Sequence, residues 1–126
     1  MQEKINILLV DDNPDKLLVL EAVISDPAYN LVKAASGKEA LRHLLKEDFA
    51  VIVLDVKMPH MDGFETAGFI RMRKRSENTP IIFITAHSKD EIHTIKEDFS
   101  GPVDYIFAPF DAEILRRKIR DFVELF

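Results

Sequence analysis

The sequence predicts an α/β fold, a doubly wound parallel sheet of five strands accompanied by five helices. Short apolar runs rich in Ile, Leu and Val alternate with longer segments in which apolar residues recur at helical spacing. Such runs are typical of strands covered on both faces, as in parallel sheets. The alternation implies right-handed crossovers between parallel strands. With 126 residues, 47% of them hydrophobic, the chain has the length and the core material for one domain.

The first strand and helix open the chain. The strand is predicted at Ile5–Val10. Asn13 followed by Pro14 suits an N-cap and a first helical residue. Apolar and polar residues then recur at helical spacing as far as Ile24, and Pro27 stops the helix.

The second strand is predicted at Tyr29–Ala35 and the third at Ala50–Leu54. Between them, Ser36 and Glu39 match a capping box, in which each side chain satisfies a backbone N–H of the other residue. The helix that follows has an apolar face formed by Ala40, Leu41, Leu44 and Leu45. The third strand is the most apolar of all and ends at Asp55.

A turn-rich stretch separates Asp55 from the third helix, whose first turn Asp62 and Glu65 are expected to cap. Phe64, Ala67, Phe69, Ile70 and Met72 are the apolar residues of this helix. The far end of this helix is basic, since it carries Arg71, Arg73, Lys74 and Arg75. We interpret it as a solvated helix terminus. The fourth strand is predicted at Pro80–Ile84.

The last elements are a helix at Lys89–Ser100, a fifth strand at Val103–Phe107 and a C-terminal helix. Ser88 and Glu91 form a capping box for the first of these helices. The C-terminal helix ends in the apolar sequence 122–126. These residues either pack against the sheet, form a dimer face, or belong to a helix that continues into a downstream domain.

Composition excludes several classes of protein. Acidic residues (22) outnumber basic residues (17) and the net charge is −5, which argues against direct binding of nucleic acid. The absence of Cys excludes disulfides, thiolate zinc sites and iron–sulfur clusters. Every apolar run is far shorter than the roughly 20 residues that span a membrane. We therefore expect a soluble, cytoplasmic domain with no membrane partner.

Acidic residues follow two of the predicted strands. Asp11 and Asp12 come after the first strand and Asp55 after the third, while Thr85 ends the fourth. Because the carboxyl ends of parallel strands share one edge, these side chains converge if the strands are neighbours. A single Asp in such a place is often only a helix cap, but clustered carboxylates call for a cation. Oxygen ligands alone favour Mg²⁺ or Mn²⁺.

A carboxylate beside Mg²⁺ can act as a nucleophile toward a phosphoryl donor. Asp55 is the candidate, since it follows the most apolar strand and should be the most rigidly placed, and the Thr85 hydroxyl can hold phosphoryl oxygens. A magnesium-dependent phosphohydrolase fits less well, because that class needs a second acid two residues after its nucleophile. A nucleotide-binding domain fits poorly too, since no Gly-rich phosphate loop is present.

The sequence resembles a response-regulator receiver domain of two-component signalling over essentially its whole length. The resemblance is carried by Asp11-Asp12, by Asp55 with Met58-Pro59 and Asp62-Gly63 after it, by Thr85-Ala86, and by Tyr105 before Ala108-Pro109-Phe110. It implies a flavodoxin-like fold with strand order 2-1-3-4-5, and a single domain over residues 1–126, stand-alone or excised from a longer multidomain chain.

The resemblance also implies roles for these residues. Asp55 would be phosphorylated by a histidine kinase or a histidine phosphotransfer protein, and the chain would catalyse at most its own phosphorylation and dephosphorylation. The metal ligands would be Asp11 (mainly through water), Asp12, Asp55 and the backbone carbonyl of Lys57. Thr85, followed by Ala86, would move toward the phosphoryl group and Tyr105 would swing inward. An output domain in cis, or a partner protein in trans, would read the altered surface.

One residue departs from the family pattern. Receivers carry Lys before the last Pro, where this chain has Ala108. Ala supplies neither a charge nor a donor, so we expect stronger dependence on Mg²⁺ and weak coupling of phosphorylation to Thr85 and Tyr105. Lys57 and Lys89 are the nearest replacements by loop position, and His87 is a candidate for tuning the lifetime of the phosphoryl group. The alternative is a pseudo-receiver that binds proteins without being phosphorylated.

Overall fold

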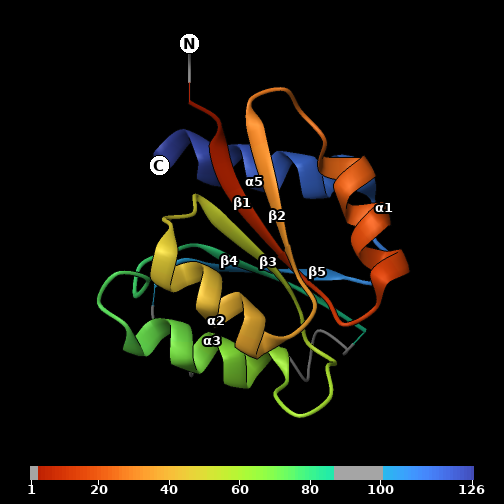
Figure 1. The fold of residues 1–126 in the computed structure, drawn as a ribbon. Coiled ribbons are helices and arrows are strands. Elements are labelled where there is room, and N and C mark those ends of the chain that lie inside the picture. Colours follow the sequence, from red (N-terminus) through yellow and green to blue (C-terminus); the bar gives the residue numbers. More distant parts are fainter. Residues whose placement is uncertain (1–2, 87–100) are drawn as a thin grey trace.

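The computed structural model of the chain describes residues 3–86 and 101–126. The five strands form one parallel sheet in the order β2-β1-β3-β4-β5 (Figure 1). This confirms the predicted fold class and strand order. The strands are β1 Ile5–Val10, β2 Tyr29–Ala34, β3 Val51–Asp55, β4 Ile81–Thr85 and β5 Val103–Phe107.

Four helices are described, α1 Pro14–Ile24, α2 Gly37–Lys46, α3 Gly63–Met72 and α5 Ala112–Leu125. In Figure 1, α1 and α5 cover one face of the sheet and α2 and α3 the other. The predicted helix Lys89–Ser100, with its capping residues Ser88 and Glu91, lies outside the described residues. The two helical layers explain why the central strands are apolar on both faces.

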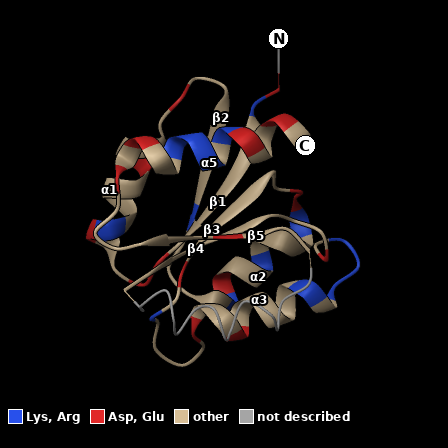
Figure 2. Ribbon diagram, turned by 180° about the vertical axis from the view of Figure 1, so that it is seen from behind, with Lys and Arg blue, Asp and Glu red and all other residues tan. Residues whose placement is uncertain are grey.

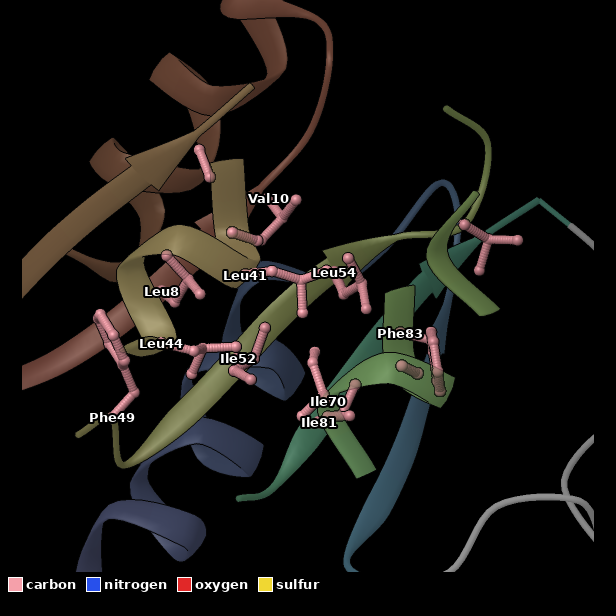
Figure 3. Packing of buried hydrophobic residues seen from close by; sticks show 14 of the residues in the cluster. Leu8, Val10, Leu41, Leu44, Phe49, Ile52, Leu54, Ile70, Ile81 and Phe83 are labelled. Atoms are coloured by element: carbon pink, nitrogen blue, oxygen red, sulfur yellow. The ribbon is translucent and has the colours of Figure 1, made fainter. Parts of the chain in front are cut away.

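The two faces of the sheet build separate hydrophobic cores. Successive residues of β1 point in opposite directions, so that Leu8 packs toward α2 and α3 while Ile7 and Leu9 pack toward α1 and α5. Figure 3 shows the first of these cores, with Ile52 and Phe83 among its fully buried side chains. Tight packing on both faces holds the strand ends, and the residues that follow them, in fixed places.

Strand boundaries differ slightly from the predicted ones. β2 ends at Ala34 instead of Ala35. The third and fourth strands were expected one residue earlier than they lie; β3 begins at Val51 and β4 at Ile81. Asp55 therefore belongs to the sheet itself, since it pairs with Ile84.

The helix caps largely follow the sequence signals. The Asn13 side chain accepts from the N–H of Asp15 at 2.9 Å, and Asp62 and Glu65 form the complete capping box. At α2 the prediction was half wrong. The Ser36 hydroxyl accepts from the backbone N–H of Glu39, as predicted. The Glu39 carboxylate accepts from the backbone N–H of Ala35 instead of that of Ser36. That arrangement still satisfies a backbone donor at the helix start.

Two predictions about side-chain exposure were wrong. Leu45 is 62% exposed and does not join the buried face of α2. The arginines after Ile70 are not simply solvated: Arg71 donates to the carbonyls of Thr79 (2.7 Å) and Pro102 (2.9 Å), and Arg73 donates to that of Leu41. They join neighbouring segments of the chain through hydrogen bonds to backbone carbonyls.

Charged residues lie mainly on the helices and loops around the sheet, with both signs on α1, α2 and α5 (Figure 2). Among the residues described, no helix combines the length and apolar character needed to cross a bilayer.

Candidate metal centre

Three carboxylates meet at the carboxyl edge of the sheet. Oxygen atoms of Asp11, Asp12 and Asp55 lie within 4.8 Å of one another. The topology brings them together, because β1 and β3 are neighbours with Val10 paired to Leu54. The next residues along the two strands therefore face each other. The sequence prediction of an acidic cluster at this edge is confirmed.

Asp11 is the buried member of the cluster, with only 4% of its surface exposed. One of its carboxylate oxygens accepts from the backbone N–H of Asn13 at 2.9 Å, which fixes the side chain. Burial raises the pKa of Asp11, while that N–H and the charge of Lys16 oppose the increase.

Asp55 lies half-buried between the other two carboxylates and the cavity described below. Burial, followed by the charge of Asp11, raises the pKa of Asp55 from its ordinary value of 3.8 to about 6. Lys16 and a hydrogen bond from the backbone N–H of Lys57 act in the opposite direction. Asp55 is thus a carboxylate whose ionised form needs a positive neighbour.

The donor set fits a hard divalent cation. All three candidate ligands are oxygens, they are close enough to share an ion, and their mutual repulsion favours a cation between them. Magnesium usually keeps some of its waters, so a three-carboxylate site open to solvent at Asp12 suits it. The backbone carbonyl of Lys57 stays a predicted fourth ligand.

The turn after β3 is held tightly against the site. The backbone N–H of Val56 donates to the carbonyl of Ile84. The backbone N–H of Gly63 donates to the carbonyl of Val56 at 2.8 Å. A Cβ on Gly63 would stand 2.3 Å from the carbonyl oxygen of Asp55, well inside contact distance. Glycine at this position lets α3 begin directly against the backbone of Asp55.

Thr85, Ala86 and Ala108 lie beside Asp55, as the strand order predicts. All four line one cavity of about 450 Å³ that reaches from Asp11 to the start of α5. The N–H of Ala108 donates to the carbonyl of Thr85 at 2.8 Å, which joins the ends of β4 and β5. The Ala108-Pro109 peptide bond is cis. Ala108 contributes a methyl group to this cavity, at the position where the resemblance to receivers implies a lysine.

Tyr105 lies deeper in the fold. It is 7% exposed, and its ring stacks on Phe83 with centroids 5.2 Å apart. Burial raises the pKa of its phenol. The Tyr105 side chain therefore already points into the fold. Its inward swing on phosphorylation stays a prediction.

Sequence reasoning missed Lys16. This residue lines the cavity together with Asp11 and Asp55, and its charge acts on both carboxyls. Lys89 and His87, two of the residues singled out from loop position, lie outside the described residues. The signal that could have found Lys16 is its place in the first turn of the helix after Asp11-Asp12, which begins at the same sheet edge.

Comparison with known proteins defines the class. The chain combines a doubly wound parallel sheet with this acidic cluster, and the model of the response regulator receiver domain family matches residues 7–120. The chain belongs to the receiver domain family of two-component signalling.

Relatives differ greatly in length. A probable cyclic di-GMP phosphodiesterase of Vibrio cholerae is 33% identical over 113 residues, which cover 90% of this chain but 25% of that protein. An uncharacterized 14.6 kDa protein of Leptolyngbya boryana is 35% identical over 119 residues, covering 94% of this chain and 90% of that protein. The chain thus spans a quarter of one relative and nearly all of the other.

One similar solved structure contains a metal ion. The receiver domain of the sensor histidine kinase PA1611 from Pseudomonas aeruginosa has magnesium coordinated in its active-site cleft. It is similar to this chain with a TM-score of 0.84 and 26% identity, covering 96% of this chain and 98% of that one.

Proposed function

We propose that Asp55 accepts a phosphoryl group from the phosphohistidine of a histidine kinase or a histidine phosphotransfer protein. The observation that carries this proposal is the cluster of Asp11, Asp12 and Asp55 at the carboxyl edge of the sheet. The reaction would occur in the cytoplasm, and residues 1–126 would act as a single receiver domain.

The chemistry needs a positioned carboxylate and charge compensation. An oxygen of ionised Asp55 attacks phosphorus as the P–N bond to the donor histidine breaks. The electron pair of that bond goes to the ring nitrogen, which takes up a proton as the imidazole leaves. The product is an acyl phosphate on Asp55. Bound Mg²⁺ (or Mn²⁺) would supply positive charge to the carboxylates and the phosphoryl oxygens. Its ligands would be Asp11, Asp12, Asp55 and the backbone carbonyl of Lys57.

Thr85 and the backbone N–H of Ala86 would bind phosphoryl oxygens, and their place in the wall of the cavity beside Asp55 supports this role. A shift of Thr85 would pass to β5 through its backbone hydrogen bond with Ala108. Tyr105 lies in that strand. The surface of β4, β5 and α5 would then be read by an output domain in cis or a partner protein in trans, including a second copy of the chain.

A second function is favoured by Ala108. Without a lysine there, the phosphoryl group has a weaker link to β5. The alternative is a pseudo-receiver whose surface binds proteins independently of phosphorylation.

Phosphorylation is tested with an acyl phosphate and Mg²⁺, followed by intact mass measurement of this chain and of Asp55→Asn. We expect an increase of about 80 Da, the mass of one phosphoryl group, in the unaltered chain only. If neither protein gains mass, the pseudo-receiver is the better assignment.

A further inference from the structure

The cavity beside Asp55 lacks the cation that the family places at its rim. Ala108 lines this cavity and contributes only a methyl group. Two lysines line it as well, Lys16 from α1 and Lys57 from the turn after β3. Either one could compensate the carboxylates.

The charge of Lys16 reaches the acidic cluster. Its ammonium group lowers the pKa of Asp55 and that of Asp11. Lys57 acts on Asp55 through its backbone N–H. Lys16 therefore combines a place in the wall of the cavity with a charge that acts on Asp55.

The backbone of Lys16 is well placed for this task. Asn13 caps α1 by accepting from the N–H groups of Asp15 and Lys16, so the first turn of the helix is fixed beside Asp11. The Lys16 side chain is exposed, and its flexible four-carbon stem can bring the ammonium group toward an anion in the cavity.

The rest of the cavity strengthens the interaction. Its wall includes Val19 and Val23 of α1 and Phe110 before α5. An apolar wall keeps the local dielectric constant low, so a cation there interacts more strongly with a dianionic phosphoryl group than it would in water.

We propose that Lys16 supplies the cation that contacts the phosphoryl group on Asp55, in place of the lysine absent at position 108. This inference rests on the proposed function, because it concerns the same acyl phosphate. Lys16 stays protonated throughout and adds no covalent step. It stabilises the charge that develops on the phosphoryl oxygens during transfer.

The test compares Lys16→Met, which keeps much of the stem and removes the charge, with Lys46→Met at the far end of α2. At saturating Mg²⁺, we expect Lys16→Met to slow phosphorylation by acetyl phosphate roughly tenfold and to weaken beryllofluoride binding by a similar factor. Lys46→Met should stay within about twofold of the unaltered chain, and Lys16→Arg should retain most of the activity. Intact mass gives the rate, and NMR titration gives the affinity.

Metal affinity provides an independent readout. Removing a positive charge near three carboxylates should tighten Mg²⁺ binding by the unphosphorylated chain several-fold. A merely structural role of Lys16 would not strengthen metal binding while weakening beryllofluoride binding.

A double-mutant cycle with Ala108→Lys decides whether Lys16 replaces the missing lysine. In the Ala108→Lys background, Lys16→Met should change the rate by less than about twofold, since the cation is then supplied from β5. An equal loss in both backgrounds, or no loss in the natural background, overturns the inference and leaves the proposed function intact. If the unaltered chain neither gains a phosphoryl group nor binds beryllofluoride, the proposed function fails and the role of Lys16 fails with it.

Discussion

At Asp55, burial and the neighbouring Asp11 carboxylate both oppose ionisation, and this creates the need for a cation. The pKa of about 6 lies close to neutral pH, so protons and metal ions compete for the same oxygens. A residue that is costly to ionise when alone becomes fully ionised when a divalent ion is bound. The same property makes the phosphoacceptor measurable through stability.

We expect Asp55→Asn to stabilise the metal-free protein at pH 7 by on the order of 1–2 kcal/mol. The pKa of Asp55 is higher in the folded chain than in the unfolded one. Its contribution to stability is therefore complete below about pH 4 and is lost as the pH rises through about 6. Urea denaturation in EDTA from pH 4 to 8 measures this, and equal pH profiles for the two proteins would contradict it.

A positive charge at position 108 should reduce the stabilisation of the protein by bound Mg²⁺. We expect Mg²⁺ to raise the melting temperature of the unaltered chain more than that of Ala108→Lys, since the lysine already relieves repulsion among the carboxylates. Ala108→Met, which adds length without charge, should respond to Mg²⁺ like the unaltered chain. A shift in the lysine variant as large as that in the unaltered chain would refute the idea.

At the scale of the elements, α3 is closely joined to the site. Its capping box begins at Asp62, and its first residue touches the backbone of Asp55. At its other end, Arg71 donates to the carbonyl of Pro102, just before β5. The helix thus links the turn after β3 to the strand that carries Tyr105.

Gly63→Ala should destabilise the protein by about 1–3 kcal/mol, because the added Cβ forces α3 away from the Asp55 backbone. It should also weaken Mg²⁺ binding, since the turn that carries Lys57 moves. Gly68→Ala is the control: no atom lies within 4 Å of its added Cβ, and Ala in a helix interior is worth about 0.5–1 kcal/mol more than Gly. Chemical denaturation and Mg²⁺ titration of both variants check this; equal effects would be contrary to expectation.

For the whole molecule, the question is how far a phosphoryl group on Asp55 reaches. The proposed route would run through Thr85, its backbone hydrogen bond with Ala108, and β5. The Tyr105 ring is already packed on Phe83. Phosphorylation of Asp55 would therefore change the position of this ring less.

We expect beryllofluoride to shift NMR signals near Asp55 strongly and those of Tyr105 only weakly in this chain. In Ala108→Lys the shift at Tyr105 should grow, because an ammonium group on β5 then contacts the phosphoryl mimic directly. The spectrum of Asp55→Asn with beryllofluoride serves as the control. A full shift of Tyr105 in the unaltered chain would show that coupling does not need a lysine at position 108.

The sequence by itself determined the parallel sheet, its strand order through the family resemblance, and the meeting of Asp11, Asp12 and Asp55. These follow from local patterns, since apolar periodicity defines the elements and parallel topology gathers the strand ends at one edge. Boundaries such as that of β3 were off by one residue, because pairing with β4 extends the strand to Asp55.

Only the tertiary structure decided what surrounds those carboxylates. The pKa of Asp55 depends on burial by neighbouring elements, and the place of Lys16 depends on how α1 packs beside the cavity. The inward position of Tyr105 and the carbonyl contacts of Arg71 likewise join residues far apart in the chain. Contacts of this kind arise from packing between elements, which no local pattern of residues encodes.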